Sequence, residues 1–173
     1  MITVITVVSA FAAGRGGDAA ALVFEYMAAT QAETGRTVPT GISDLPAVLQ
    51  RECRNLRAVY RPPGAVLIAD YGGKPAGCVG LAACSSEHTA EIKRLYVRPA
   101  CRGTGIARTL MSHAHHHAAQ HGLTRLILDV LPARTAVIRF YRGLGYSETE
   151  SPATGAPVPM ICMERPITSD DIL

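Results

Sequence analysis

The sequence predicts an α/β (α+β layered) fold, in which helices flank a mixed central β-sheet. Two helix-like segments come first, and from Gly64 the apolar residues change from helical spacing to strand-like runs. Further along, a strand-like run at residues 91–97 leads through a glycine loop into a long Ala-rich helical run. With 173 residues, 48% of them hydrophobic, and with no linker or repeat, the chain suits a single domain over residues 1–173.

The first half of the chain predicts one strand and two helices. Residues 1–13 are rich in β-branched residues, lack a basic leader and are too short to cross a bilayer, so they indicate a first strand of a cytoplasmic protein rather than a signal peptide. One helix over residues 18–31 begins at a cap, Asp18, and ends before Gly35. The next is capped by Ser43 or Asp44 and tolerates Pro46 in its first turn. The positions expected to face the core are Leu22, Val23, Tyr26 and Met27, then Leu45, Val48, Leu49, Cys53 and Leu56.

The second half predicts most of the sheet. Apolar runs at residues 65–71 and 76–83 flank a Gly72-Gly73-Lys74 turn and indicate a β-hairpin. The elements expected after it are a strand at 90–97, a helix at 104–121, a strand at 124–130, a short helix at 135–142, and strands near 146–150 and 158–164.

The loop from Arg102 to Ala107, RGTGIA, is the most informative local feature. A strand that leads into a glycine loop and a helix N-terminus aims several backbone N–H groups, and the positive end of the helix dipole, at one point. Gly103 and Gly105 can adopt positive φ and carry no Cβ, so phosphate oxygens can approach the main chain. Neither the third glycine of a dinucleotide fingerprint nor the Gly-Lys-Ser/Thr of a triphosphate loop is present. The loop therefore predicts a site for another diphosphate, although such a turn can also be purely structural.

Arg102, Gly105 and Ala107 satisfy the pattern Arg/Gln-x-x-Gly-x-Gly/Ala, and the strand before them ends Leu-Tyr-Val. With these residues the chain resembles the GNAT superfamily of N-acetyltransferases, whose members hold the pyrophosphate of acetyl-CoA in such a loop. Residues 73–83, 123–130 and 136–146 resemble the neighbouring strands and the second signature of that family, in the same order. The resemblance implies the GNAT acyl-CoA N-acyltransferase fold, with two splayed parallel strands, and the transfer of an acetyl group to a primary amine by direct attack in a ternary complex.

The resemblance also implies which residues bind acetyl-CoA, the expected cosubstrate. Residues Arg102, Gly103, Thr104, Gly105, Ile106 and Ala107 would hold its diphosphate. The strand residues Leu95, Tyr96 and Val97 would lie along its pantetheine arm, with the main chain of Leu95 and Val97 pairing like an added strand. One departure is Arg134, which stands where relatives usually have Asn. Either this arginine reaches a phosphate of CoA, or the pantetheine contact of relatives is missing here.

Acetyl transfer to an amine requires that the amine lose a proton. An alkyl amine has a pKa near 10.4, so at neutral pH a carboxylate must help, directly or through water. Glu91 is the candidate base, because it matches the position where several relatives place their catalytic glutamate. The alternative is a structural carboxylate that pairs with Lys93 or Arg94.

The departing thiolate needs a proton, and the oxyanion needs a hydrogen-bond donor. Tyr141 is the expected proton donor, because it matches the family's tyrosine in the segment FYRGLGY. From the residues alone it would more often be a core side chain, as Val137 and Phe140 are expected to be. The exposed backbone N–H of Val97, or of a neighbour, would polarise the thioester carbonyl.

Positive charge is concentrated in the part of the chain that contains the loop. Between Ile92 and Arg142 there are nine basic residues and one acid, a net charge of +8 against +3 for the whole chain. A nucleic acid could use such a field, but aromatic residues make up only 5% of the chain and Trp is absent. The phosphates of CoA explain the field better, with a solvated basic face as the alternative. Neither nucleic acid nor membrane is expected as a partner.

Histidines and cysteines give weaker signals. His113, His117 and His121 are spaced i, i+4 on one helix, as in a metal site, but no Asp, Glu or Cys lies nearby in sequence, so we expect no metal. The five cysteines form no CxxC pair and indicate reduced thiols.

The acceptor is expected to be a small-molecule amine. By resemblance it would bind between the first two helices and the loop before the last strand, near residues 26–57 and 151–157, where Arg51, Arg54 and Arg57 suggest a carboxylate on the acceptor. The sequence leaves open whether the protein forms a homodimer. Two other functions are to be weighed: a non-catalytic acetyl-CoA-binding or regulatory module, and a His-rich metal-binding protein.

Overall fold

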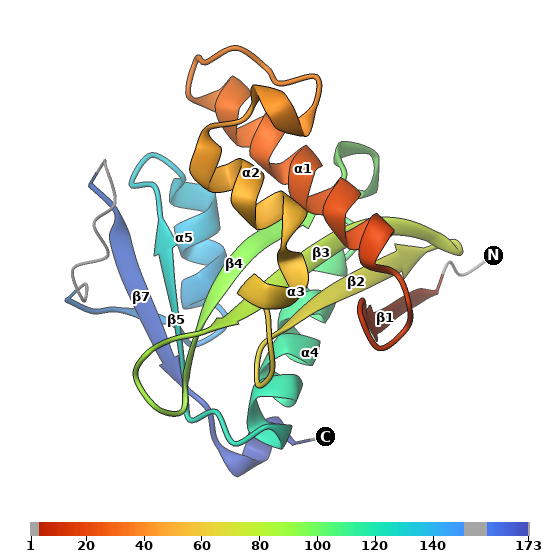
Figure 1. Ribbon diagram of the computed structural model, residues 1–173. Helices are drawn as coiled ribbons and strands as arrows, with labels where there is room; N and C mark the ends of the chain where they lie inside the picture. The colour runs from red at the N-terminus through yellow and green to blue at the C-terminus, as the bar shows by residue number, and fades with distance from the viewer. Residues whose placement is uncertain (1–3, 151–158, 173) are drawn as a thin grey trace.

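The computed structural model describes residues 4–150 and 159–172, which form a central sheet with helices on both faces (Figure 1). The strands are β1 (Ile5–Ser9), β2 (Ala65–Tyr71), β3 (Lys74–Ala83), β4 (Thr89–Val97), β5 (Arg125–Val130), β6 (Ser147–Glu148) and β7 (Ile161–Pro166). Their order in the seven-stranded sheet is β1-β2-β3-β4-β5-β7-β6, and β4 and β5 form its parallel pair. The helices are α1 (Gly16–Glu33), α2 (Ala47–Arg54), α3 (Leu56–Val59), α4 (Ile106–Gln120) and α5 (Thr135–Arg142). The predicted mixed sheet flanked by helices is confirmed.

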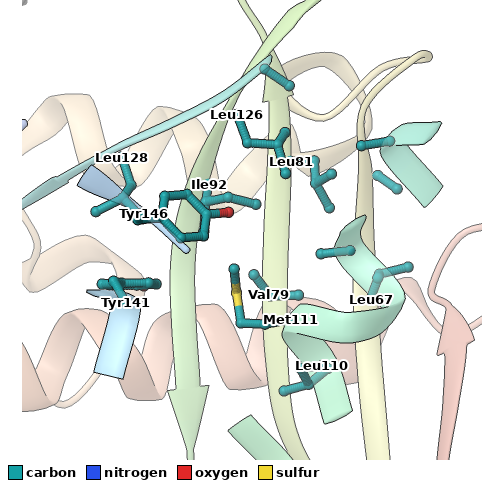
Figure 2. Packing of buried hydrophobic residues seen from close by; sticks show 14 of the residues in the cluster. Leu67, Val79, Leu81, Ile92, Leu110, Met111, Leu126, Leu128, Tyr141 and Tyr146 are labelled. Atoms are coloured by element: carbon teal, nitrogen blue, oxygen red, sulfur yellow. The ribbon is translucent and has the colours of Figure 1, made fainter. Parts of the chain in front are cut away.

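Each face of the sheet carries its own apolar core. On one face α4 contributes Leu110 and Met111, which pack against Val79 and Leu81 of β3 (Figure 2). On the other face α1 packs Leu22, Val23 and Met27 against Ile68 and Cys78, as shown by α1 and α2 in front of the sheet in Figure 1. Truncating one of these fully buried Leu side chains to Ala would cost about 2–5 kcal/mol of folding stability. The two cores hold both faces of β4 and thus fix the strand that leads into the glycine loop.

The β2–β3 hairpin forms where the sequence predicts it. Tyr71 pairs with Lys74, and Gly72 and Gly73 between them have φ values of 60° and 77°. Positive φ at both central residues is the requirement of a two-residue type I′ turn, and the Gly-Gly pair meets it without strain.

The helical half differs from the prediction at its caps. α1 begins at Gly16, so Asp18 lies inside its first turn and pairs with Arg15, Nε to Oδ2 at 2.8 Å. The predicted second helix is divided into a 3₁₀ turn at Ile42–Asp44 and the helices α2 and α3, which meet at Asn55. Because α2 begins only after Pro46, Val48 is 63% exposed instead of buried.

The last strands are also shorter than predicted. β6 comprises two residues, and β7 begins at Ile161. Val158, the predicted start of β7, and the predicted acceptor loop at residues 151–157 lie outside the described residues.

The parallel strands separate after a short contact. β4 pairs with β5 from Thr89 to Glu91, whereas β4 continues to Val97 and β5 to Val130. On its other edge β4 pairs with β3, but the register shifts between Cys78 and Gly80, so that Arg94 and Leu95 both lie opposite Val79. This β-bulge and the separation of the strands open the sheet on one side of β4.

Candidate active site

A cleft of about 1440 Å³ lies where β4 and β5 separate. Its walls come from α1, β4, the glycine loop, the first turn of α4, β5 and α5. The predicted site residues that line it are Glu91, Leu95, Tyr96, Val97, Arg102, Gly103, Gly105, Ile106, Ala107, Arg134 and Tyr141. Residues brought together from positions 91–141 therefore share one cavity, large enough for a ligand of the size of CoA and a small acceptor.

The glycine loop presents its backbone to this cleft. Gly103 and Gly105 have φ of 78° and 90°, and a Cβ at either position would meet no atom within 4 Å. Gly105 is also the N-cap of α4 and provides no side-chain cap, so the first N–H groups of the helix have no partner from it. Thr104 is the exception among the loop residues: its hydroxyl turns back to donate to the carbonyl of Cys101 at 2.6 Å, and it does not line the cleft. The open, uncapped turn fits a diphosphate.

The free edge of β4 continues from the loop. The N–H of Arg98 donates to the carbonyl of Ala76, toward β3, at 2.8 Å. Since successive N–H groups of a strand point to opposite edges, the N–H groups of Val97 and Leu95 are directed to the edge that β5 has left. An extended, amide-containing arm such as pantetheine fits this edge as an additional strand.

Tyr141 lies in the wall of the cleft with its ring in the core. Its side chain is buried, and its ring lies edge-on to that of Tyr146 (Figure 2) and to that of Phe140, with centroids 5.5 Å away in both cases. Burial, and to a lesser degree Tyr26, raise the pKa of the Tyr141 phenol, while Arg134 opposes that shift. The hydroxyl is therefore protonated at neutral pH, as a proton donor must be. Val137 and Phe140, expected in the core, are only partly buried and also line the cleft.

Glu91 lines the cleft on the α1 side of β4. Its Oε2 lies 3.4 Å from Nζ of Lys93, so the ion pair that sequence analysis weighed against a catalytic role is present. Both side chains are partly exposed, and the long separation leaves the carboxylate able to take another partner. Asp129 of β5, which sequence analysis did not select, also lines this part of the cleft.

Arg134 connects two walls of the cleft. Its Nη2 donates to Oε2 of Glu33 at 2.6 Å and to Oγ1 of Thr30 at 3.2 Å, both on α1. The side chain thus links the start of α5 to α1, across a separation of about 100 residues in sequence. Glu33 and Thr30 could not be recognised as partners of Arg134 from local sequence patterns.

A buried ionic network lies under the bulge of β4. The guanidinium of Arg94 donates to both oxygens of Glu52, Nε to Oε1 at 2.8 Å and Nη2 to Oε2 at 2.7 Å, and the hydroxyl of Tyr60 donates to the same Oε1 at 2.7 Å. Burial raises the pKa of Glu52, but the hydrogen bonds and charge of Arg94 outweigh burial, so that the net shift is downward. Glu52 is not among the site residues predicted from the sequence, although positions 45, 49, 52 and 56 share one helical stripe and the charge at 52 interrupts its apolar character.

Many basic residues between positions 92 and 142 form ion pairs with carboxylates from outside that stretch. Arg98 pairs with Glu25 at 2.7 Å, Arg125 with Glu164 at 3.5 Å, and Arg142 with Glu148. Within the described ranges, Arg102 and Arg108 form no ion pair, and both line the cleft at the glycine loop. Arg139 of the same stretch also has no ion pair among the described residues but lies outside the cleft lining, so two of the three unpaired charges lie where a diphosphate would bind.

The histidines of α4 have other partners. His117 donates through Nε2 to the carbonyl of Pro63 at 2.9 Å and stacks on His121 with ring centroids 3.9 Å apart. His115 is buried against Tyr146, with Nε2 and the phenol oxygen 3.1 Å apart, and burial lowers its pKa to about 4. Over residues 4–150 and 159–172, no group of three or more His, Cys, Asp or Glu side chains is placed to hold a metal. All five cysteines are free thiols.

The arginines expected near the acceptor lie elsewhere. Arg51, Arg54 and Arg57 are absent from the cleft lining, and Arg57 lies over the ring of Phe11, 4.8 Å from its centroid. The first helix does line the cleft, through Tyr26, Ala29, Thr30 and Glu33. In the described part of the chain, no helix has the length and apolar character needed to cross a bilayer.

Comparison with known proteins identifies the family. The model of the acetyltransferase (GNAT) family matches residues 30–146. An uncharacterised N-acetyltransferase of Schizosaccharomyces pombe is 32% identical over 116 residues, which cover 66% of this chain and 71% of that protein. A GNAT-family acetyltransferase from Staphylococcus aureus Mu50 has a similar structure, with a TM-score of 0.73 at 13% identity over 95% of this chain and 100% of that chain. The structure of yncA from Salmonella typhimurium with its cofactor acetyl-CoA gives a TM-score of 0.69 at 21% identity over 95% of both chains.

The chain therefore belongs to the acetyltransferase (GNAT) family. It is an acyltransferase, and more narrowly an N-acetyltransferase. The family, fold and enzyme class predicted from the sequence are confirmed, while the roles of individual site residues stay predictions.

Proposed function

We propose that this enzyme transfers the acetyl group of acetyl-CoA to a primary amine of a small molecule, by direct attack of the amine in a ternary complex. The observation that carries the proposal is that the glycine loop, the free edge of β4, Glu91 and Tyr141 all line one cleft. This arrangement supports the proposal, because it would give the diphosphate a binding site and would supply an acid and a base in the same cleft.

The binding half of the site is mostly backbone. In our proposal the main chain of residues 102–107 holds the diphosphate. The free N–H groups at the start of α4 and the charges of Arg102 and Arg108 add to this binding. The main chain of Leu95 and Val97 orients the pantetheine arm. Because Arg134 is already bound to Glu33 and Thr30, we favour the interpretation that it shapes the wall on the acceptor side and that the pantetheine contact of relatives is missing.

The reacting half needs two proton transfers. Glu91, directly or through water, accepts a proton from the amine as nitrogen attacks the thioester carbon. A backbone N–H at the bulge, that of Leu95 or Val97, stabilises the oxygen on which charge develops. When the C–S bond breaks, Tyr141 donates its proton to the thiolate; its raised pKa keeps that proton available at neutral pH. The products are an amide and free CoA thiol.

The acceptor is proposed to bind against α1. Tyr26, Thr30 and Glu33 of α1 line the same cleft as Glu91, and the volume of the cleft leaves room for a small amine. We place the reaction in the cytoplasm, because five unpaired thiols suit a reducing compartment. Fractionation of the native host would test that location.

Release of free thiol from acetyl-CoA, measured across a panel of amino acids, polyamines and aromatic amines, tests the proposal. We expect turnover with at least one amine and loss of turnover when Tyr141 is replaced by Phe. Heat of acetyl-CoA binding without thiol release from any amine would contradict the proposed reaction and favour the binding module. A metal-dependent role would be favoured instead if EDTA abolished activity and elemental analysis found bound metal.

A further inference from the structure

Arg94 has a backbone conformation that is unusual for a residue inside a strand. Its φ is +58°, in the left-handed region, and among the described non-glycine residues only His88 shares a positive φ. A side chain with a Cβ adopts this region at a cost, and it persists only where surrounding structure holds it. Arg94 is also the residue at which β4 bulges away from β3. The conformation therefore needs a cause outside the strand.

Contacts at both ends of Arg94 supply that cause. Its carbonyl oxygen accepts a hydrogen bond from the thiol of Cys78, with 3.4 Å between sulfur and oxygen. Its guanidinium is bound by two hydrogen bonds to Glu52 and lies over the ring of Tyr26, 5.4 Å from the centroid. A planar guanidinium held by both carboxylate oxygens has one orientation, which constrains the backbone that carries it.

Glu52 is itself held in place. The residue is 8% exposed, and its carboxylate accepts a hydrogen bond from the hydroxyl of Tyr60, a residue that is 1% exposed. The ring of Tyr60 packs directly on Gly80 of β3, where a Cβ would lie only 2.3 Å from ring atom Cε1. The Glu52 carboxylate is thus held against β3 through Tyr60, and it constrains Arg94 on the neighbouring strand β4. We call Glu52 and Tyr60, together with Arg94, the bulge clamp.

The bulge clamp acts on the part of β4 that faces the cleft. Arg94 immediately precedes Leu95, so the backbone torsions of Arg94, whose φ is left-handed, set the direction of the Leu95 N–H. That N–H points to the edge of β4 from which β5 has separated, as argued from the Arg98 to Ala76 hydrogen bond. A change of conformation at Arg94 would rotate this donor away from the cleft.

We propose that Glu52 is a positioning residue for acetyl transfer: through Arg94 it holds the bulge of β4 in the conformation that aims the Leu95 N–H at the thioester carbonyl. This inference rests on the proposed function. Glu52 is absent from the cleft lining, and it acts through Arg94 without contacting the reacting atoms. Tyr60 supports it by fixing one carboxylate oxygen.

Two double variants separate this role from simple loss of an ion pair. E52A/R94A and E52A/R94G both remove the buried charges, so neither leaves an unpaired ion. Glycine adopts the left-handed region without strain, whereas alanine does not. If the clamp serves to hold that conformation, we expect kcat of E52A/R94G to exceed that of E52A/R94A by about tenfold, with similar Kd for acetyl-CoA.

Y60F gives the same test in a variant that keeps the packing against Gly80. Loss of one hydrogen bond to Glu52 should lower kcat about threefold and leave the Kd for acetyl-CoA unchanged. The matched control is D70N, which neutralises the carboxylate of another bidentate pair, Arg15 to Asp70 at 2.7 and 2.9 Å, outside the cleft lining. We expect D70N to lower thermal stability without a specific loss of kcat.

A readout that does not require turnover separates this inference from the proposed function. The infrared C=O stretch of bound [1-¹³C]acetyl-CoA reports the hydrogen bond to the thioester oxygen. We expect a shift to lower frequency on binding to the wild type, retained in E52A/R94G and reduced in E52A/R94A. Equal frequencies and equal kcat in the two double variants, both binding acetyl-CoA, would overturn the positioning role alone. Binding and a normal carbonyl shift without turnover on any amine would overturn the proposed reaction alone.

Discussion

Replacement of Gly105 by Ala tests whether the glycine loop binds through its backbone. Gly105 has φ of 90°, so Ala there is strained by about 1–2 kcal/mol, and the chain relieves that strain by rotating the adjacent N–H groups. Because a Cβ at Gly105 meets no protein atom within 4 Å, it would project into the open space where we place the phosphates. Losing about one charge-assisted hydrogen bond, worth about 1.5–3 kcal/mol, corresponds to a Kd for acetyl-CoA that is weaker by about 10–150-fold.

The matched control for G105A is G73A. Gly73 has a φ of 77° and also has open space around its missing Cβ, but it lies in the β2–β3 hairpin, outside the cleft lining. Both variants should lose about 2–8 °C in Tm from backbone strain. Isothermal titration with acetyl-CoA should show weakened binding in G105A only. Equal affinities in the two variants would refute the reasoning, because strain without a change in binding would mean that the loop does not contact the ligand.

Three further predictions concern catalysis and pH dependence. Y141F should lower kcat by about 10²-fold or more with little change in Kd for acetyl-CoA, because only the proton donor is lost; full kcat in single-turnover assays would remove Tyr141 from the mechanism. E91Q should lower kcat/KM by about 10²-fold at pH 7, and kcat/KM should recover as the pH approaches the pKa of the amine. K93Q should not show this loss. Similar losses in both variants would mean that the Glu91–Lys93 pair is only structural. The pKa of His115 is lowered to about 4 in the folded protein, against about 6.5 in the unfolded chain, so the unfolded chain binds a proton more readily. The folding stability should therefore fall by up to about 3 kcal/mol as the pH falls from about 6.5 to 4. Urea unfolding of H115Q should show a smaller loss over that window, and curves parallel to the wild type would contradict the assignment.

The features that sequence analysis predicted are those encoded over short distances. The glycine loop and the β2–β3 turn depend on the φ preferences of adjacent residues, and α5, Thr135–Arg142, was expected at the same bounds. The family resemblance added the separation of β4 from β5, which periodicity does not contain. Arg102 and Tyr141 lie in one cleft because the chain between them forms α4 and then β5, which returns beside β4.

The features that sequence analysis missed depend on partners far apart in the chain. Arg94 and Glu52 are separated by 42 positions, and Arg134 and Glu33 by 101, so neither pair leaves a local pattern. The left-handed conformation of Arg94 was also unpredictable, because the residue type gives no preference for it and the clamp imposes it. The apparent excess of positive charge near the loop was misleading for the same reason: several of its arginines pair with carboxylates from the rest of the chain.

Calorimetric titration of the wild-type enzyme with acetyl-CoA and, separately, with S-acetylpantetheine compares ligands with and without the diphosphate. If backbone N–H groups at positions 102–107 provide the main anchor, acetyl-CoA should bind at least about 100-fold more tightly, a difference of about 2.7 kcal/mol. Equal affinities for the two thioesters, or no heat with acetyl-CoA at saturating concentration, would contradict the account.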